Sequence, residues 1–465
     1  MFQRYPQKSA SNERFGVFIG ALAAAVGIGL YWGFTVDDAL IAARVARHLH
    51  LGLGYRFNAS GVAVDAVTPF GWEPLLSPFA TRSPWGAWIA ARYIASVAWI
   101  AACGWLGREV VRDRGTLAPF WLIAFSAPLG AWAGSGMETG FIVALATVAT
   151  GKSRVSLGAA GIAAALRPEL VPFACVIALG HTRSVERVVV PLLIGLGPAV
   201  AVAIARILLF GAAYPLAVAA KPPDLPSGIL YLVQTVIFGG PLWLWLGPGW
   251  KSLAKHDRWT ATAVIAHLAA VTLVGGDWMV LLRLSAPILP AAAKIATQLL
   301  RQRTLHHSLP SWVGAIAATA YLGWHTGRPG RHIVEQRASL VAAAIPLLKS
   351  ARVVATLDVG WVGVAHSGTI VDLAGVTSPD VAYLQGGHTT KRIDASLLRA
   401  RRVDHLLLLL APGAAIATPW DQSHFSRGVE VRVAHFAAAL GCEANATVAL
   451  QRTRQIYLLV RCPGS

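Results

Sequence analysis

The strongest constraint on this chain is a series of apolar segments long enough to cross a lipid bilayer. The hydrocarbon core is about 30 Å thick, and a helix needs about 20 residues to span it. Segments 15–32 and 85–105 have that length. Shorter or similar apolar segments follow at 117–133, 141–150, 155–166, 170–179, 189–210, 229–246, 261–274, 279–299 and 312–324. The sequence therefore predicts about eleven spans, with the grouping between 117 and 180 left open because several pieces are short.

Composition supports a membrane protein. Of the 465 residues, 55% are hydrophobic and 13% are charged, and the mean hydropathy is +0.56. The net charge of +18 is spread over short basic clusters between apolar segments, which is typical of cytoplasmic loops facing anionic lipid and argues against a nucleic-acid partner. The first apolar run ends in Tyr31-Trp32 and lacks a small-x-small site. This favours an uncleaved first span over a signal peptide.

Charge placement gives an orientation. With a cytoplasmic N-terminus, every connection assigned to the inside is basic, as the positive-inside rule requires. An odd number of spans then puts the tail outside, as expected for a multi-pass protein of a bacterial inner membrane. The basic residues are Arg108, Arg112 and Arg114, Lys152 and Arg154, Arg183 and Arg187, Lys251, Lys255 and Arg258, and Arg301 and Arg303.

The tail differs in character from the rest. Short apolar or alternating runs at 352–357, 405–410, 429–436 and 455–460 predict strands, and 395–401 predicts a helix. The domains expected are a transmembrane catalytic domain at 1–329, with an outer loop at 33–84, and a small extracytoplasmic α/β domain at 330–465. An oxidising compartment would permit a disulfide between Cys442 and Cys462, which flank an expected strand hairpin. The fold class is therefore mostly α, a polytopic helical bundle with this α/β domain.

The expected outer connections collect charged residues at one membrane face. The adjacent acids Asp37 and Asp38 begin the first of them. Charged groups at span ends also anchor helices, but their convergence from five connections favours a site. The other candidate residues are Glu138, Arg167, Glu169, Tyr214, Lys221, Asp277, Trp278 and Arg283, with Arg44, Arg47 and Trp72 from the first connection.

These residue types suit sugar transfer from a lipid-linked donor. A carboxylate takes the proton of an attacking hydroxyl, and cations stabilise the leaving phosphate. Asp37 or Asp38 would be the base, and the expected donor ligands are Arg44, Arg47, Glu138, Arg167, Glu169, Lys221, Asp277 and Arg283. Trp72, Tyr214 and Trp278 would be acceptor or sugar platforms.

Residues 39–51 predict an amphipathic helix in the membrane interface, which also suits a purely structural connector. His48 and His50 do not make a metal site on their own. No cofactor is firmly expected, although a divalent cation between Asp37 and Asp38 stays open.

The first connection resembles that of the GT-C superfamily of membrane glycosyltransferases, and most closely the actinobacterial cell-wall arabinofuranosyltransferases. The pattern in register comprises Asp37, Asp38, Ala39, Ile41, Arg44, Ala46, Arg47, Leu49, Gly52, Gly54 and Asn58, then Asp65, Thr68 and Trp72. Further likeness lies at Gly136, Glu138 and Thr139, at Arg167, Pro168 and Glu169, at Pro215 and Lys221, at Gly276, Asp277, Arg283 and Pro287, and in the tail at Asp358, Gly360, Asp372 and Gly375.

The resemblance implies an inverting transferase that uses a polyprenyl-phosphate sugar, with an aspartate of this loop as base. We favour Asp37, with Asp38 orienting donor or cation. His48 replaces an Asn of the family pattern, and Ala66-Val67 replaces a Gly-Tyr pair. The sugar and the acceptor, a cell-envelope glycan or a lipid, stay open. The alternatives are a polyprenyl-linked sugar flippase or transporter, disfavoured because no internal repeat is visible, and a non-catalytic scaffold.

Overall fold

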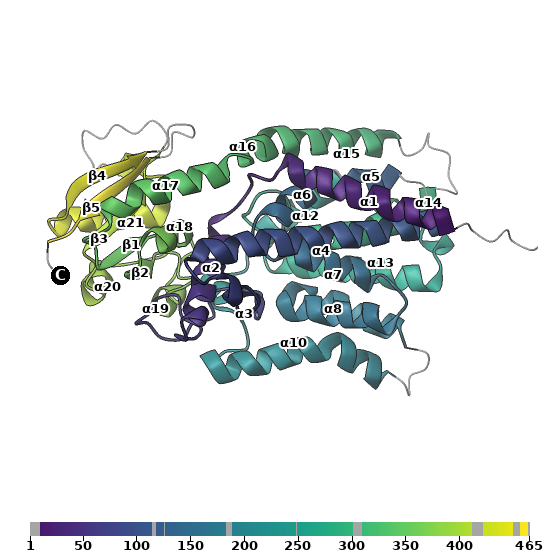
Figure 1. Cartoon of the computed structure of the whole chain (residues 1–465), viewed down its shortest axis with the longest axis horizontal. Coiled ribbons are helices and arrows are strands. Elements are labelled where there is room, and N and C mark those ends of the chain that lie inside the picture. Colours follow the sequence, from purple (N-terminus) through teal and green to yellow (C-terminus); the bar gives the residue numbers. More distant parts are fainter. Residues whose placement is uncertain are drawn as a thin grey trace, which may run out of the picture. The chain divides into compact units, whose positions relative to one another are not determined.

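The computed structural model describes residues 10–113, 118–124, 126–182, 188–247, 249–300, 309–411, 422–449 and 456–463. The predicted inside residues Arg114, Arg183, Arg187, Arg301 and Arg303 lie outside this part of the chain. The described chain divides into two compact units, drawn with their element labels in Figure 1. Unit 1 is Met1–Thr35, Ala91–Val202 and Pro223–His332, and unit 2 is Val36–Ala90, Ala203–Pro222 and Ile333–Ser465.

Unit 1 is a helical bundle. Its elements are α1 (Ala10–Leu30), most of α4 (Pro84–Arg112), α5 (Ala118–Ala124), α6 (Ala127–Gly134), α7 (Thr139–Ala149), α8 (Arg154–Leu166), α9 (Val171–Gly180), most of α10 (Val189–Phe210), α12 (Leu225–Gly239), α13 (Lys255–Leu273), α14 (Leu289–Leu300) and α15 (Leu309–Leu322). One apolar core runs through these helices.

Four helices in the described residues are long and apolar enough to cross a bilayer, Ser11–Leu30, Pro84–Arg112, Val189–Phe210 and Leu225–Trp243. The helices α7, α8 and α9 have only 11, 13 and 10 residues, and about 1.5 Å of rise per residue leaves each short of 30 Å. Their lengths explain why the grouping between 117 and 180 could not be read from the sequence. The prediction of about eleven spans stays a prediction.

Glycines allow α1 and α4 to pack closely. A Cβ on Gly20 would lie 2.4 Å from the carbonyl oxygen of Cys103, and one on Gly107 would lie 2.3 Å from that of Gly16. Neither backbone can move away without opening the helix pair. Small residues four apart at a helix crossing are the usual means of close packing between membrane helices.

Unit 2 contains a five-stranded sheet in the order β2-β1-β3-β5-β4. The parallel strands β1 (Val353–Thr356), β2 (Thr369–Asp372) and β3 (His405–Leu409) are joined by an antiparallel hairpin of β4 (Glu443–Ala449) and β5 (Ile456–Arg461). Its helices are α2 (Asp37–His50), α3 (Trp72–Leu76), α11 (Leu216–Ala220), α17 (Ile333–Leu347), α18 (Val359–Ala365), α19 (Pro379–Ala382), α20 (Ala395–Ala400) and α21 (Gly428–Ala439).

The structure confirms strands at β1, β3 and β5 and the helix α20, but the strand expected at 429–436 is wrong. This segment lies in α21, where Val429, Val433 and Ala437 are buried at helical spacing. The Val-Glu-Val-Arg-Val alternation imitates a strand period, while the apolar positions continue every four residues. Cys442 and Cys462 flank the β4–β5 hairpin and are disulfide-bonded.

The first loop folds with the tail. Residues Val36–Ala90 belong to unit 2 together with the sheet, whereas the sequence analysis assigned the loop and the tail to different domains. The helix predicted at 39–51 is present as α2, but most of it is buried, including Arg44 and His48. It packs against α18 and α3. Of the two interpretations of this helix, a structural connector describes its apolar face better than a helix in the membrane interface.

Candidate functional site

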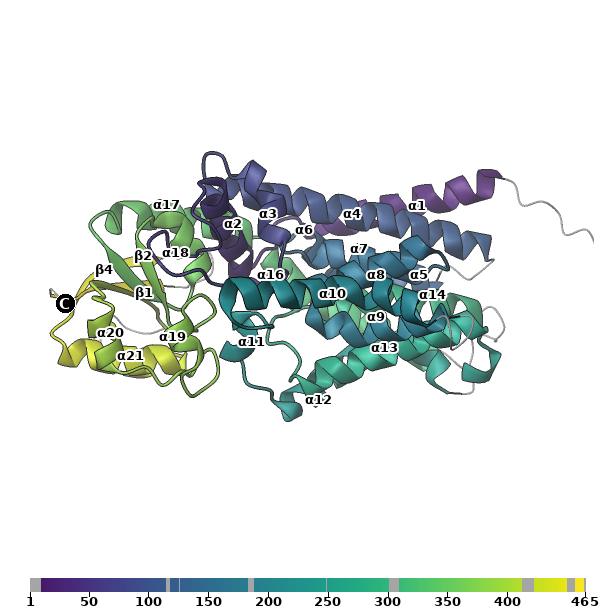
Figure 2. The same ribbon diagram turned by 90° about the horizontal axis from the view of Figure 1, so that it is seen from below.

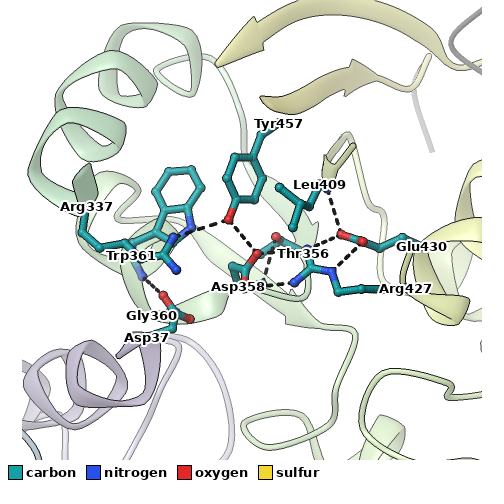
Figure 3. Close-up of polar contacts among 10 residues, drawn as sticks. All are labelled: Asp37, Arg337, Thr356, Asp358, Gly360, Trp361, Leu409, Arg427, Glu430 and Tyr457. Carbon is teal, nitrogen blue, oxygen red and sulfur yellow. Dashed lines mark hydrogen bonds and ion pairs between the residues drawn. The ribbon is translucent and has the colours of Figure 1, made fainter. Parts of the chain in front are cut away.

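The adjacent acids form the first turn of α2. Asp37 accepts hydrogen bonds from two backbone N–H groups at the start of α18, that of Gly360 at 2.7 Å and that of Trp361 at 2.9 Å (Figure 3). A side chain on Gly360 would collide with α2, because its Cβ would lie 2.0 Å from the carbonyl oxygen of Asp37. A glycine at 360 therefore lets the tail bring two N–H donors to the carboxylate.

A second carboxylate, Asp358, lies beside this contact in a dense charge network. Arg427 donates to both of its oxygens, at 3.1 and 3.0 Å, and the Tyr457 hydroxyl donates to one of them at 2.9 Å. Arg427 also donates to Glu430, whose other oxygen accepts from the Leu409 N–H at 2.9 Å. Asp358 and Glu430 therefore share one guanidinium, as Figure 3 shows.

Arg337, from α17, is the cation that acts on Asp37. Its guanidinium lies 3.4 Å from the Tyr457 hydroxyl and interacts electrostatically with Asp37 and Asp358. Its Nε atom is buried and has no hydrogen-bond partner among the described residues. Arg337 therefore compensates Asp37 through space rather than by a direct ion pair.

These surroundings shift the pKa values of Asp37 and Asp358 in opposite directions. Burial raises the pKa of Asp37 to about 7, assisted by the negative charge of Asp358 and opposed by Arg337 and the two N–H donors. Burial acts on Asp358 in the same sense, but Arg427 and Arg337 outweigh it and lower the pKa of that carboxyl. Asp37 is thus a carboxyl that exchanges its proton near neutral pH, which is the property a general base needs.

Asp38 has a different environment. Its side chain is partly exposed and makes no hydrogen bond or ion pair with any described residue. Successive residues of a helix are rotated by about 100°. The Asp38 carboxylate therefore lies off the contact between Asp37 and α18 and is available to an external ligand.

The structure assigns Arg44 a role other than the one predicted. Its guanidinium donates to four backbone carbonyls, those of Phe57 at 2.7 Å, Gly363 and His366 at 2.6 Å each, and Gly368 at 2.8 Å. Three of these carbonyls lie in the tail. Arg44 joins the first loop to the tail, and four of its five N–H donors are occupied. We therefore propose no contact between Arg44 and the donor phosphate.

The loop is held at two further points. The Asn58 side chain donates to the Ile370 carbonyl and accepts from the Ile370 N–H, at 2.8 and 2.9 Å. Asp65 accepts from Arg206 at 2.7 Å, and burial nevertheless raises the pKa of Asp65 to about 6. Arg206 was missed in the sequence, although a charge inside the apolar run 189–210 requires a partner.

The remaining candidates in unit 2 differ in exposure. Arg47 donates through Nη1 to the carbonyls of Ala80 and Thr81, at 2.8 and 2.6 Å. Its other guanidinium nitrogens make no hydrogen bond within the described residues. Trp72 is buried, which removes its ring as a sugar platform, whereas Tyr214 is 47% exposed. Lys221 follows α11 directly.

In unit 1 the structure brings Glu138, Arg167 and Glu169 together. Arg167 contacts Glu138 at 3.1 Å and Glu169 at 2.7 Å, and all three side chains are largely buried. The break between α8 and α9 at the Arg-Pro-Glu sequence lets the guanidinium reach both acids. The cluster carries one negative charge in excess.

Asp277 and Arg283 form a second ion pair in unit 1, at 2.6 Å, with both side chains buried. The turn between them contains Leu281 and Leu282 at φ of 62° and 50°, a strained conformation for branched residues. Trp132 and Tyr231 hold this turn through the carbonyl of Leu281 and the N–H groups of residues 284 and 285. Trp278 in the same turn is 59% exposed.

One buried histidine joins the two clusters. His267 places Nδ1 3.0 Å from the Glu169 carbonyl and Nε2 2.8 Å from the Leu284 carbonyl. His267 was not among the site residues predicted from the sequence. A His inside the apolar segment 261–274 is the signal that would have identified it.

The residues present do not fit a protein-bound divalent cation. Both oxygens of Asp37 face N–H donors, and Arg337 is nearby, an environment that repels a cation. No group of three or more His, Cys, Asp or Glu side chains suited to a metal occurs in the described residues.

Comparison with known structures identifies the fold. Comparison of the sequence with protein-family models and with curated protein sequences gives no match. The structure, however, has a fold that is already known. Two crystal structures of ArnT from Cupriavidus metallidurans match it with a TM-score of 0.53, over 96% of this chain and 98% of that chain, at 12% sequence identity. One is the apo state, and the other is bound to undecaprenyl phosphate.

Proposed function

We propose that this protein is an inverting glycosyltransferase that moves a sugar from a polyprenyl-phosphate donor to an acceptor hydroxyl. The observation that carries the proposal is the Asp37 carboxyl, held by two N–H donors with a pKa near 7, in a chain with the fold of ArnT. The undecaprenyl phosphate bound to one ArnT structure is the kind of lipid that such a reaction releases. The GT-C resemblance of the first loop points to the same chemistry.

The reaction is a single displacement. The acceptor oxygen attacks the anomeric carbon, while the bond from that carbon to the phosphate oxygen breaks and its electron pair leaves with the phosphate. The hydroxyl proton goes to Asp37, and the products are the glycosylated acceptor and polyprenyl phosphate. A base with a pKa near the working pH is efficient in such a transfer.

The leaving phosphate needs cations that contact its oxygens. Arg47 retains guanidinium nitrogens that no described residue occupies, and Lys221 supplies a second cation in unit 2. We assign the donor phosphate to these two residues. Asp38 is the carboxylate that orients the sugar, and the exposed ring of Tyr214, in the same unit, is a sugar platform. A platform role for Trp278, in unit 1, stays a prediction from the sequence. Arg167 and Arg283 are paired with acids and shape unit 1.

Finer points of the proposal rest on the sequence alone. The likeness of the first loop to the arabinofuranosyltransferases is the sole support for an arabinofuranosyl donor or a cell-envelope acceptor, and the charge rule is the support for the outer face of a bacterial inner membrane. A polyprenyl-linked sugar flippase is the competing function, because a fold that accommodates the lipid would serve transport as well. A flippase needs no base at residue 37.

One preparation tests the transferase and the flippase side by side. Purified protein in lipid vesicles is given a panel of radiolabelled polyprenyl-phosphate sugars with glycan and lipid acceptors, beside Asp37→Asn and Asp38→Asn. Release of polyprenyl phosphate from one donor, lost in Asp37→Asn, supports the transferase. Movement of intact donor across the vesicle membrane without any release, and equally in both variants, overturns it in favour of the flippase.

A further inference from the structure

Unit 1 has a cavity of about 690 Å³ that the proposed reaction does not use. Its lining residues come from the start of α8, the end of α9, the start of α10 and the start of α13, helices that Figure 2 labels. Lys152 belongs to the α7–α8 connection, and His181 and Thr182 directly follow α9. The sequence predicts both of these connections on the cytoplasmic side.

Two cations line the cavity. Lys152 and Arg154 are exposed and make no hydrogen bond or ion pair within the described part of the chain. They flank Ser153, which caps the 13-residue helix α8 by accepting from the Ser156 N–H at 3.1 Å. The positive end of that helix adds to the two side-chain charges. The cavity therefore attracts an anion such as a phosphodiester.

Histidine adds a hydrogen-bond acceptor to the lining of the cavity. His181 has Nδ1 2.9 Å from the Ile177 carbonyl, and because a carbonyl only accepts, this nitrogen carries the proton. The remaining nitrogen, Nε2, is then an acceptor, and it is buried with no hydrogen-bond partner among the described residues. A hydroxyl group would satisfy it. The combination of an anionic phosphate with a hydroxyl is the chemistry of a glycerol-type phospholipid headgroup.

The opposite wall of the cavity is apolar. Leu157 and Ile194 line it beside Val189 and Val190. Val189, Val190 and Leu193 are 59%, 57% and 64% exposed, and only 11% of the apolar window of α10 is buried in the structure. This helix presents a hydrocarbon surface that continues from the cavity along the bilayer. An acyl chain attached to the headgroup would lie there.

We propose that this cavity binds the headgroup of an anionic phospholipid of the surrounding membrane, with Lys152 and Arg154 on the phosphodiester, His181 on a headgroup hydroxyl and an acyl chain against α10. Basic pockets between membrane helices on the cytoplasmic side are known to take such headgroups. The site is separate from the residues of the proposed transferase reaction and does not depend on that function.

Native mass spectrometry of the delipidated full chain tests this. The protein is titrated with phosphatidylglycerol, phosphatidylcholine or undecaprenyl phosphate, with and without millimolar inorganic phosphate. The wild type should retain one phosphatidylglycerol, and Lys152→Gln/Arg154→Gln should weaken retention about tenfold or more. The matched control is Lys251→Gln/Lys255→Gln, which removes the same charge from exposed residues on the same predicted side, outside the cavity lining, and should change retention less than about twofold.

Three results would overturn the proposal. Equal loss of phosphatidylglycerol retention in both double variants would show that only the net charge matters. Equal retention of phosphatidylcholine and phosphatidylglycerol would exclude a role for the anionic charge of the lipid. Retention of undecaprenyl phosphate alone, or full displacement by inorganic phosphate, would assign the cavity to another ligand. Lys152→Arg/Arg154→Lys keeps both charges and should restore binding, which separates a binding defect from a folding defect.

Discussion

Two buried carboxylate clusters of this protein compensate their charges in opposite ways. In unit 1, Glu138 and Glu169 each contact the guanidinium of Arg167 directly. In unit 2, Asp37 has no ion pair within 4 Å in the described residues and relies on two backbone N–H groups and on Arg337 acting through space. The first cluster pairs both of its acids directly with one cation. The second leaves Asp37 with a pKa near 7, where its proton is exchangeable.

This difference indicates which buried acids can exchange a proton near neutral pH. A direct charge pair favours the ionised form of an acid, although burial of Asp65 outweighs its pair with Arg206 and raises the pKa of Asp65 to about 6. At Asp358 the pair prevails, because Arg427 helps to lower the pKa of this carboxyl although it lies beside Asp37. We therefore expect substitutions at Asp37 to affect the rate and substitutions at Arg167 to affect stability.

The largest effect is expected for Asp37→Asn. Loss of a general base lowers kcat by about 10²–10⁴-fold, while the amide still accepts one of the two N–H hydrogen bonds. The measurement is single-turnover sugar transfer with the donor identified in the panel. Glu443→Gln, at an exposed acid of β4, is the matched control and should retain the wild-type rate. A kcat for Asp37→Asn within threefold of that control would argue against Asp37 as base.

Arg167→Gln should cause the next largest change, in stability. It leaves Glu138 and Glu169 buried without their cation, and breaking a buried charge pair costs about 3–5 kcal/mol. Unfolding in detergent, followed by circular dichroism, measures the loss. Adding Glu138→Gln and Glu169→Gln should recover part of it. A triple variant as unstable as Arg167→Gln alone would show that packing, and not charge, is responsible.

Arg44→Lys should separate anchoring from donor binding. One ammonium cannot reach the four carbonyls that Arg44 now contacts, so the free energy of unfolding should fall by about 2–4 kcal/mol. The donor KM of the folded fraction should stay unchanged. Arg47→Gln should do the reverse, raising the donor KM several-fold with little change in stability. If Arg44→Lys raises KM and leaves stability intact, the assignment of the two arginines is inverted.

The smallest effect is expected for His267→Asn. Replacing the imidazole leaves at least one of the Glu169 and Leu284 carbonyls without its partner, at a cost of about 1–3 kcal/mol. Thermal unfolding measures it, with His435→Asn on the tail helix α21 as the control. His267 joins the two charged clusters of unit 1. The loss of stability caused by His267→Asn should therefore be smaller in the Arg167→Gln background than in the wild type. Strict additivity would contradict that coupling.

Periodicity and turn chemistry made much of the fold predictable. Helix α2, the strands β1, β3 and β5 and the bundle of apolar helices follow from local patterns. The helix α21 did not, because Val-Glu-Val-Arg-Val fits both periods and only burial of Val433 and Ala437 decides between them. Local pattern cannot arbitrate where two periods agree over five residues.

The site was predictable in its acids but not in its partners. Asp37 and Asp38 stand out because adjacent charges beside a membrane span need a reason. The roles of Arg44, Arg337 and Arg427 depend on contacts with residues far away in the chain, 319 positions in the case of the Arg44 contact with Gly363. Sequence reasoning placed Arg44 on the substrate because the residue type suits phosphate equally well.

The pH dependence of kcat/KM tests the central claim most directly. Because Asp37 must be deprotonated to accept the hydroxyl proton, kcat/KM should rise with pH and level off above about 7. Arg337 lowers the pKa of Asp37, so in folded Arg337→Gln this limb should move to higher pH. A profile that is flat between about pH 5 and 8, or a limb that Arg337→Gln does not move, would contradict Asp37 as the base.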